Sequence, residues 1–204
     1  MDGVITNTMS YHFDAWLEVL SEAGIKIDCY DVYKREGQPG LTTIRELSRE
    51  QNKKISLEKA KALLHKKEGL FKRIVKIKFV KGASAFLRNL HSRHIVLSLV
   101  TGTSRHEMEK ILPKQLRKLF SFIVTGDEVK HGKPNPEPFL KAVAKINFRR
   151  NEIVVIENAP FGIEAAKRAG LFCAAMETSL PKTYLKKADI VVKSFAELKK
   201  KINF

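Results

Sequence analysis

The sequence predicts an α/β protein with a doubly wound parallel sheet. In the second half of the 204-residue chain, apolar runs bounded by turn residues alternate with amphipathic stretches. Gly170 follows Lys167-Arg168-Ala169 at the end of one amphipathic stretch, as glycine does after a helix C-terminus. The first third of the chain lacks the alternation and shows amphipathic stretches only. We therefore expect a helical unit inserted between the first strand and the rest of the sheet.

The pattern assigns a residue range to each element. Strands are expected at residues 94–100, 121–125, 153–156, 171–176 and 189–192. Helices are expected between them at residues 84–92, 107–119, 137–146, 162–169 and 195–202. In the helical unit, the ranges are 11–22, 42–49 and 56–71, and Ser56 is expected to cap the last of these. The resulting domains are a core of residues 1–9 and 79–204 and a helical unit of residues 10–78.

Composition narrows the class of protein. Hydrophobic residues make up 44% of the chain, which is enough for a sizeable core. No apolar run approaches the roughly 20 residues that a membrane span needs, and no signal peptide pattern is present. The expected compartment is the cytoplasm. Cys29 and Cys173 lie far apart in sequence, and they support neither a disulfide framework nor a zinc site.

The formal net charge of +16 raises the question of a nucleic-acid partner. The lysines are scattered, however, and no stacking aromatic residues are interleaved with them. We therefore favour solvated helix faces over a nucleic-acid-binding stripe, and a small anionic substrate would also benefit from the positive field.

Polar residues follow several predicted strands at the end where an open α/β sheet binds ligands. Each has an ordinary structural alternative. Thr101-Gly102 could be a strand-end turn, Lys133 could be a surface lysine, and Asn158 could cap the helix that begins near Pro160. Asp2 could be an ordinary terminal residue. The order of these residues along the chain is stronger evidence for a functional site than any one residue is.

This order resembles the four motifs of the haloacid dehalogenase superfamily. The matching segments are Asp2-Gly3-Val4 for motif one, Thr101-Gly102 for motif two, Lys133-Pro134 for motif three, and Glu157-Asn158 with Gly162-Ile163-Glu164-Ala165-Ala166 and Ala169-Gly170 for motif four. The helical insertion resembles the cap of the phosphoglucomutase and phosphoglycolate phosphatase branch. The stretch from Thr6 to Trp16 is especially similar to β-phosphoglucomutase-like members.

Motif one is incomplete within these 204 residues. The family pattern is Asp-x-Asp-Gly-Val, so Met1 takes the variable position and the first aspartate would come directly before it. The resemblance implies that this aspartate is the nucleophile. It also implies that the first, central strand is missing between the strands that end at Thr101 and Glu157. We therefore expect the chain as written to be truncated, inactive and less stable than a longer form.

The resemblance implies phosphoryl transfer through an aspartyl-phosphate, with a role for each motif residue. Asp2 is the expected general acid and base. The expected phosphate ligands are Thr101, Gly102, Thr103 and Lys133, with Arg35 and Gln38 facing the substrate from the cap. Glu36 flanks the same glycine turn and could face the substrate as well. A solvated loop is the alternative for these three cap residues. The cofactor is expected to be Mg²⁺, held by Asp2, Glu157 and Asn158. The family commonly has two acids where this chain has Glu157-Asn158, so metal affinity is expected to be lower.

The favoured function is therefore hydrolysis of a small phosphorylated metabolite. Three alternatives remain open: a β-phosphoglucomutase-like sugar phosphomutase, a non-catalytic phosphate-binding homologue, and a basic nucleic-acid-binding protein. His12 is assigned to packing or to a hinge at the entry to the cap, and Trp16 is assigned to the core.

Overall fold

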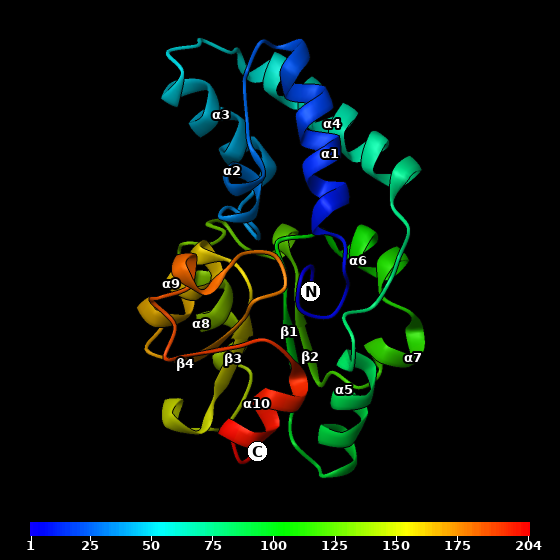
Figure 1. The fold of residues 1–204 in the computed structure, drawn as a ribbon, viewed down its shortest axis with the longest axis vertical. Helices are drawn as coiled ribbons and strands as arrows, with labels where there is room; N and C mark the ends of the chain where they lie inside the picture. The colour runs from blue at the N-terminus through cyan, green and yellow to red at the C-terminus, as the bar shows by residue number, and fades with distance from the viewer.

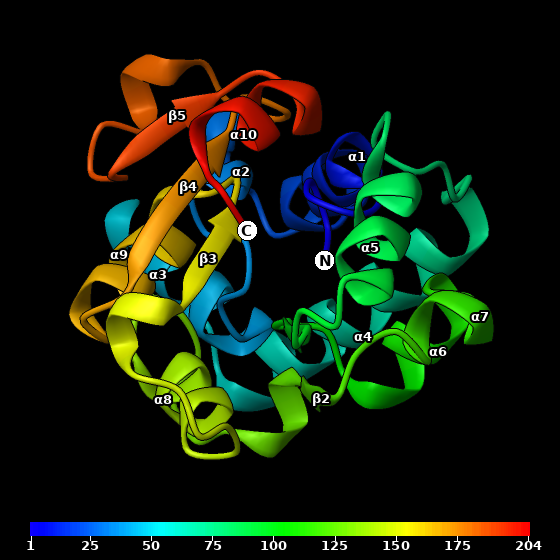
Figure 2. The same ribbon diagram turned by 90° about the horizontal axis from the view of Figure 1, so that it is seen from below.

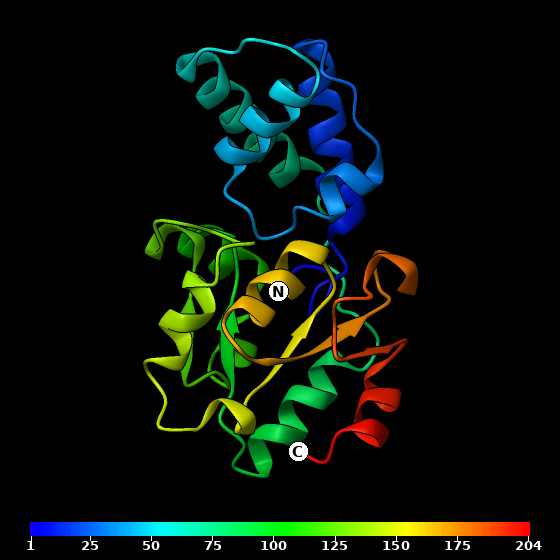
Figure 3. The same ribbon diagram turned by 90° about the vertical axis from the view of Figure 1, so that its left-hand side faces the viewer.

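The computed structural model describes residues 1–204 and divides into two parts (Figure 1). The upper part holds four helices, α1 (Met9–Glu22), α2 (Cys29–Tyr33), α3 (Gly40–Glu50) and α4 (Leu57–Ile74). The lower part holds the strands and the other helices. Figure 3 shows the same division from the side, with the N-terminus at the level where the two parts meet.

The helical part is held together by apolar faces at helical spacing. Helix α1 packs against α2 and α4, and α3 packs against α4. Trp16, Leu20 and Ile44 are buried between these helices. The predicted cap at Ser56 is confirmed, because its hydroxyl accepts a hydrogen bond from the Lys59 N–H at 3.2 Å. Helix α2 was not predicted, since it is a five-residue helix fixed by a capping box rather than by apolar periodicity.

All five predicted strands are present, and the pairing within each sheet is parallel. Strand β1 (Ser98–Val100) pairs with β2 (Phe122–Val124). Strand β4 (Phe172–Met176) lies between β3 (Val154–Glu157) and β5 (Ile190–Val192). The prediction for 94–100 was too long, because only its last three residues form a ladder.

The two sheets do not pair with each other. A cavity of about 790 Å³ lies between β1 and β3, and 26 of the 33 residues that line it are hydrophobic. Figure 2 shows β3 and β4 to the left of the N-terminus and β2 below it. A strand in this gap would join the two sheets into one, in the order β2, β1, added strand, β3, β4, β5.

Helices cover the sheets. They are α5 (Ala83–Ser92), α6 (Arg105–Ile111), α7 (Lys114–Arg117), α8 (Glu137–Val143), α9 (Pro160–Arg168) and α10 (Phe195–Lys201), with 3₁₀ turns at 126–128, 150–152 and 182–184. Helices α6 to α9 lie between successive strands, α5 precedes β1 and α10 follows β5. The single helix predicted at 107–119 was wrong. Pro113 cannot donate a backbone hydrogen bond in a helix, and the chain breaks there into α6 and α7. Gly170 follows α9 with φ +72°, as predicted.

Two short segments connect the helical part to the α/β part, and they lie side by side. The N–H of Asn7 donates to the carbonyl of Lys78 at 2.7 Å, and the N–H of Val80 donates to the carbonyl of Ile5 at 2.9 Å. Because the bonds run in both directions, the two connections support each other where the chain crosses between the parts. None of the helices is long and apolar enough to cross a membrane.

Candidate active site

The chain begins with a tight turn that buries Asp2. The N–H of Gly3 donates to the carbonyl of Thr6 at 2.7 Å, and the N–H of Ile5 donates to the carbonyl of Met1 at 2.8 Å. Gly3 has φ +70°, a conformation that favours glycine, and a Cβ there would come within 2.0 Å of the Asn158 side-chain nitrogen. This turn places the Asp2 carboxylate inside the protein, with 2% of the residue exposed.

Hydroxyl groups surround the Asp2 carboxylate. Thr8 donates a short hydrogen bond to Oδ1, and Thr103 donates to Oδ2 at 3.3 Å. Burial by itself would raise the pKa of Asp2, but the interactions with His12, the Met1 ammonium and Thr8 outweigh it and hold the pKa well below its usual range. Asp2 is therefore ionised in this state of the site, and its surroundings disfavour protonation.

His12 connects Asp2 to the cap. Its Nε2 lies 3.5 Å from Asp2 Oδ1, and its Nδ1 lies 3.0 Å from Lys67 Nζ. Because an ammonium group can only donate, Nδ1 accepts from Lys67, and the ring N–H is assigned to Nε2, facing Asp2. Stacking on Phe71 at 4.0 Å holds the ring in this position. Burial lowers the pKa of Lys67.

The sequence did not predict the contact between His12 and Lys67. Trp16 is a core residue, as predicted, but His12 also contacts the candidate acid/base group. Helical spacing from motif one could have suggested His12, since it lies one turn after Thr8 on the same helix face. Lys67 lies 55 residues further along the chain, and no local pattern connects it to His12.

Motifs three and four meet in a buried ion pair. Lys133 Nζ lies 2.5 Å from Glu157 Oε1, and both side chains are more than 90% buried. Lys133 also donates to the Val100 carbonyl at 3.4 Å, just before Thr101 at the end of β1. A buried cation is expensive unless it has partners, so these contacts hold the Lys133 ammonium at the carboxyl edge of the sheet.

Motif two lies directly against the cap. The Thr103 N–H donates to the Thr101 hydroxyl at 3.2 Å, which closes a turn after β1. A Cβ at Gly102 would come within 2.6 Å of the Gly37 backbone, and a Cβ at Gly37 would come within 2.6 Å of Lys133 Cδ. The cap loop around Gly37 therefore rests on motifs two and three, and only glycine permits this approach.

The cap loop presents Glu36 to the site. Its carboxylate has no hydrogen-bond or ion-pair partner, although the residue is only partly exposed. Burial raises the pKa of Glu36, while electrostatic interactions with the nearby His12 ring and the amino terminus oppose this shift. Glu36 is therefore an unpartnered acid on the cap side of the candidate active site.

Arg35 and Gln38, the two cap residues expected to contact substrate, are engaged within the cap instead. The Arg35 side chain is 3% exposed and forms ion pairs with Asp31, Glu46 and Glu50. Gln38 donates to Glu46 Oε1 at 3.0 Å and accepts from Thr43 at 2.9 Å. Carboxylates on α3 supply better partners than an open cleft, so these two side chains stabilise the loop and leave the site to Glu36.

The expected magnesium ligands are close together but incomplete. Asn158 lies beside Gly3, and its Nδ2 donates to Ser179 Oγ at 3.0 Å. Glu157 accepts from Lys133 through one oxygen and from the Asn158 N–H through the other, at 3.1 Å. No group of three acidic, histidine or cysteine side chains is positioned to hold a metal ion. These residues supply oxygen donors of the kind that Mg²⁺ prefers, but without a further carboxylate they do not make a complete site.

Comparison with known proteins shows which family the chain belongs to. The model of the family described as haloacid dehalogenase-like hydrolase matches residues 1–176. The chain belongs to this family. It is 34% identical over 179 residues to a phosphorylated carbohydrates phosphatase of Thermotoga maritima, a match that covers 84% of this chain and 79% of the relative.

Two further relatives cover almost the whole chain. A β-phosphoglucomutase of Bacillus subtilis is 30% identical, over 97% of this chain and 88% of the relative. The crystal structure of a hydrolase from Pseudomonas syringae superposes with a TM-score of 0.86 and 26% identity, over 98% of this chain and 94% of that one. The predicted superfamily, fold class and enzyme family of this haloacid dehalogenase-like hydrolase are confirmed.

We expect Gly162 to be required by the Lys133–Glu157 pair. A methyl group at Gly162 would come within 2.3 Å of the Glu157 carboxylate carbon, so Gly162→Ala should displace that carboxylate. The variant should be destabilised by roughly 1–3 kcal/mol, the cost of disturbing a buried polar group. Chemical denaturation measures this change.

Gly69→Ala is the matched control, because Gly69 also lies in a helix but has nothing within 4 Å of its added Cβ. This substitution should stabilise the protein by about 0.5–1 kcal/mol through helix propensity. Equal stabilisation by the two substitutions would show that Glu157 tolerates the methyl group.

Proposed function

We propose that this haloacid dehalogenase-like hydrolase catalyses phosphoryl transfer from a small phosphorylated carbohydrate to water through an aspartyl-phosphate. In this proposal the nucleophile is an aspartate directly before Met1, so the 204 residues alone do not turn over. The observation that carries the proposal is the gathering of Asp2, Thr101 and Lys133 at one edge of the sheet, beneath a cap loop. The names of the phosphatase and phosphomutase relatives support the choice of substrate class.

The chemistry divides into two steps. The nucleophilic carboxylate attacks phosphorus, and Asp2 gives a proton to the leaving alkoxide. A phosphate dianion beside Asp2 would raise its pKa and so allow it to carry that proton. In the second step Asp2 takes a proton from the attacking water, and phosphate is released. Thr101, Thr103, the Gly102 N–H and Lys133 would hold the phosphoryl oxygens as their charge develops.

We extend the proposal to Mg²⁺ only for a chain that carries the additional aspartate. Its carboxylate would complete the oxygen set begun by Asp2, Glu157 and Asn158. The ion would neutralise charge on the phosphoryl group. Residues 10–78 would act as the cap that excludes bulk water, because the loop at Gly37 rests on Gly102 and Lys133.

The test uses an extended chain, defined as residues 1–204 preceded by eight to ten residues of an apolar strand that ends in Phe-Asp. Released phosphate is measured with sugar phosphates, glycolate phosphate, nucleotides and an aryl phosphate. Asp2→Asn should lower kcat by about 10²–10⁴-fold and Lys133→Ala by about 10²–10³-fold. Full activity of both variants would mean that the site is elsewhere. Sugar phosphate isomerisation without phosphate release would favour the mutase alternative.

We expect Glu36 to select hydroxylated substrates. A carboxylate can accept hydrogen bonds from sugar hydroxyls, and Glu36 lacks a partner within the protein. In the extended chain, Glu36→Gln should raise the KM for a sugar phosphate by about 10-fold, the value of a hydrogen bond to a charged group. An aryl phosphate without hydroxyls should be affected much less. Equal losses on both substrates would assign Glu36 to the chemistry rather than to specificity.

A further inference from the structure

Helix α2 of the cap contacts the α/β part through an aromatic pair. The centroid of the Tyr30 ring lies 4.5 Å from that of the Tyr184 ring, with 36° between the ring planes. Tyr30 belongs to α2, and Tyr184 ends the 3₁₀ turn that follows β4. Tyr33 lies one turn after Tyr30 on α2, and both rings pack against the apolar cluster of the α/β part that contains Leu180 and Leu185. The short helix α2 therefore docks the cap on the core.

A backbone hydrogen bond joins the same two parts. The N–H of Phe161 donates to the carbonyl of Lys34 at 3.1 Å. Because Phe161 is the second residue of α9, its N–H has no acceptor within that helix, and the cap supplies one. Lys34 directly follows α2, and Glu36 comes two residues later. The bond therefore holds the end of α2 and the start of the loop that presents Glu36 to the candidate active site.

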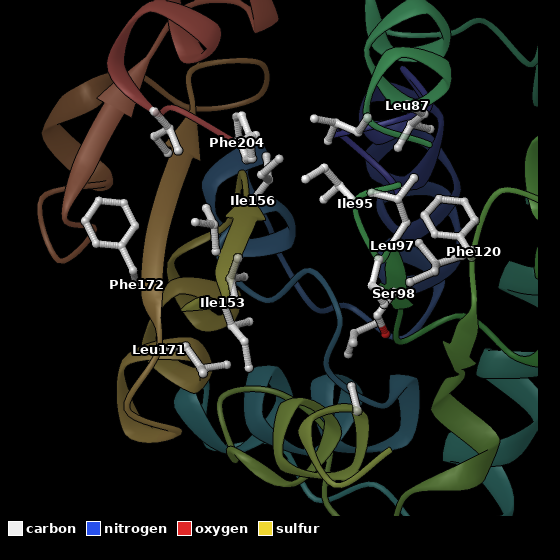
Figure 4. Close-up of a pocket in the computed structure, with 18 of the residues that line it drawn as sticks. Leu87, Ile95, Leu97, Ser98, Phe120, Ile153, Ile156, Leu171, Phe172 and Phe204 are labelled. Atoms are coloured by element: carbon white, nitrogen blue, oxygen red, sulfur yellow. The ribbon is translucent and has the colours of Figure 1, made fainter. Parts of the chain in front are cut away.

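The cap needs such contacts because its covalent connections form a hinge. The two connecting segments, residues 5–7 and 78–80, lie side by side. Two adjacent connections let a domain turn about them and do not by themselves fix the angle between the parts. The aromatic pair is also separate from the apolar cavity between β1 and β3. Side chains such as Leu97 and Ile156 line that cavity (Figure 4), whereas neither tyrosine of the pair does.

An ion pair also links the cap to the core, and we expect it to contribute less. Lys72 Nζ on α4 lies 3.3 Å from Glu107 Oε1 on α6, and the Lys72 side chain is 45% exposed. An exposed ion pair contributes little, because water screens the charges and two long side chains lose conformational freedom. An aromatic pair contributes more, since it removes apolar area from water in addition to the contact between the rings.

We propose that Tyr30 and Tyr184 form a clasp that holds the cap closed over the candidate active site. In the closed state the clasp keeps the Lys34 carbonyl on the Phe161 N–H and keeps the loop that carries Glu36 against the site. When the rings separate, the cap turns about its two connections and the site opens to solvent. The clasp concerns the folded chain and does not depend on the proposed catalytic function.

The test is amide hydrogen exchange of the 204-residue protein, followed at Phe161 and Ala166. The Phe161 N–H is protected by an acceptor on the cap, whereas Ala166 is fully buried inside the same helix. Tyr184→Ala should speed exchange at Phe161 by about 10-fold, the effect of losing one aromatic pair and the area it covers. Exchange at Ala166 should stay unchanged, because α9 itself remains folded. Equal acceleration at both amides, or at neither, would overturn the proposal.

Three further variants separate the clasp from general effects. Tyr184→Phe keeps the ring pair, so exchange at Phe161 should match that of the unaltered protein. Phe148 is 49% exposed, close to the 47% of Tyr184, but it lines the apolar cavity, so Phe148→Ala should not affect Phe161. Lys72→Met should accelerate exchange by about 2-fold at most. Acceleration by Tyr184→Phe, or a larger effect of Lys72→Met than of Tyr184→Ala, would overturn the clasp.

A double variant tests whether the two rings act through one contact. Tyr30→Ala should also accelerate exchange at Phe161. If the two tyrosines stabilise closure through each other, the variant that lacks both should exchange no faster at Phe161 than the variant that lacks Tyr30 alone. Additive effects of the two substitutions would show that the rings act independently, which would also overturn the proposal.

Discussion

The extended chain is expected to hydrolyse an aryl phosphate in the presence of magnesium, and the 204-residue chain is expected to be inactive under the same conditions. In the proposed mechanism Thr101 and Lys133 would still hold a phosphate, but without a carboxylate at the position before Met1 no aspartyl-phosphate would form. The difference in kcat should be on the order of 10⁴-fold or more, as for loss of other essential catalytic groups. Phosphate release in a side-by-side assay measures it.

The control for this prediction is the same extension ending in Phe-Asn. It supplies the strand but not the carboxylate, so it should fold like the extended chain and remain inactive. A chelator should abolish the activity of the extended chain. If the 204-residue chain hydrolyses the aryl phosphate robustly, and Asp2→Asn does not affect this, the active site has been misassigned.

The extension should also raise the melting temperature and reduce aggregation. An added strand would cover exposed apolar side chains such as Val96 and Phe172, which are 40% and 38% exposed. Burial of these apolar side chains and of those on the added strand stabilises the folded state. Pairing both sheet edges adds to the gain, so we expect a net stabilisation of several kcal/mol. For a chain of this size that corresponds to a shift on the order of 10 °C.

Calorimetry and light scattering of the two chains test this expectation. The extension ending in Phe-Asn should be as stable as the one ending in Phe-Asp, because the strand rather than the charge fills the cavity. An extension of equal length made of glycine and serine should give no stabilisation, since it cannot bury apolar surface. Equal melting temperatures and equal solubility for the extended and 204-residue chains would contradict the prediction.

Local patterns explain which elements could be predicted. The apolar runs ending near Thr101 and Glu157 were assigned to strands because a buried parallel strand is apolar on both faces. Their lengths were less well predicted, since residues 94–97 have strand composition but form no regular ladder. Pro113 marks the break between α6 and α7, and its effect on the backbone outweighs the helical periodicity of the residues around it.

Local patterns also explain which residues of the candidate site could be predicted. Asp2, Thr101, Lys133 and Glu157 could be proposed from sequence because each follows a strand or belongs to a motif, and topology brings strand ends together. Lys67 could not be proposed in the same way, and Glu36 could be named only together with Arg35 and Gln38, which flank the same glycine turn. Whether a side chain on the cap faces the core depends on how the loop at Gly37 rests on Gly102, a contact between residues 65 positions apart.

By itself, the sequence determined the superfamily, the parallel α/β fold and the order of the catalytic motifs, because these depend on periodicity and on residues adjacent in the chain. Only the tertiary structure decided that Arg35 turns into the cap, that Lys67 reaches His12, and that the sheet divides at an apolar cavity. The physical reason is that side-chain partners are chosen among all groups brought within reach by folding. A long charged side chain pairs with the nearest opposite charge, and for Arg35 those charges are on α3.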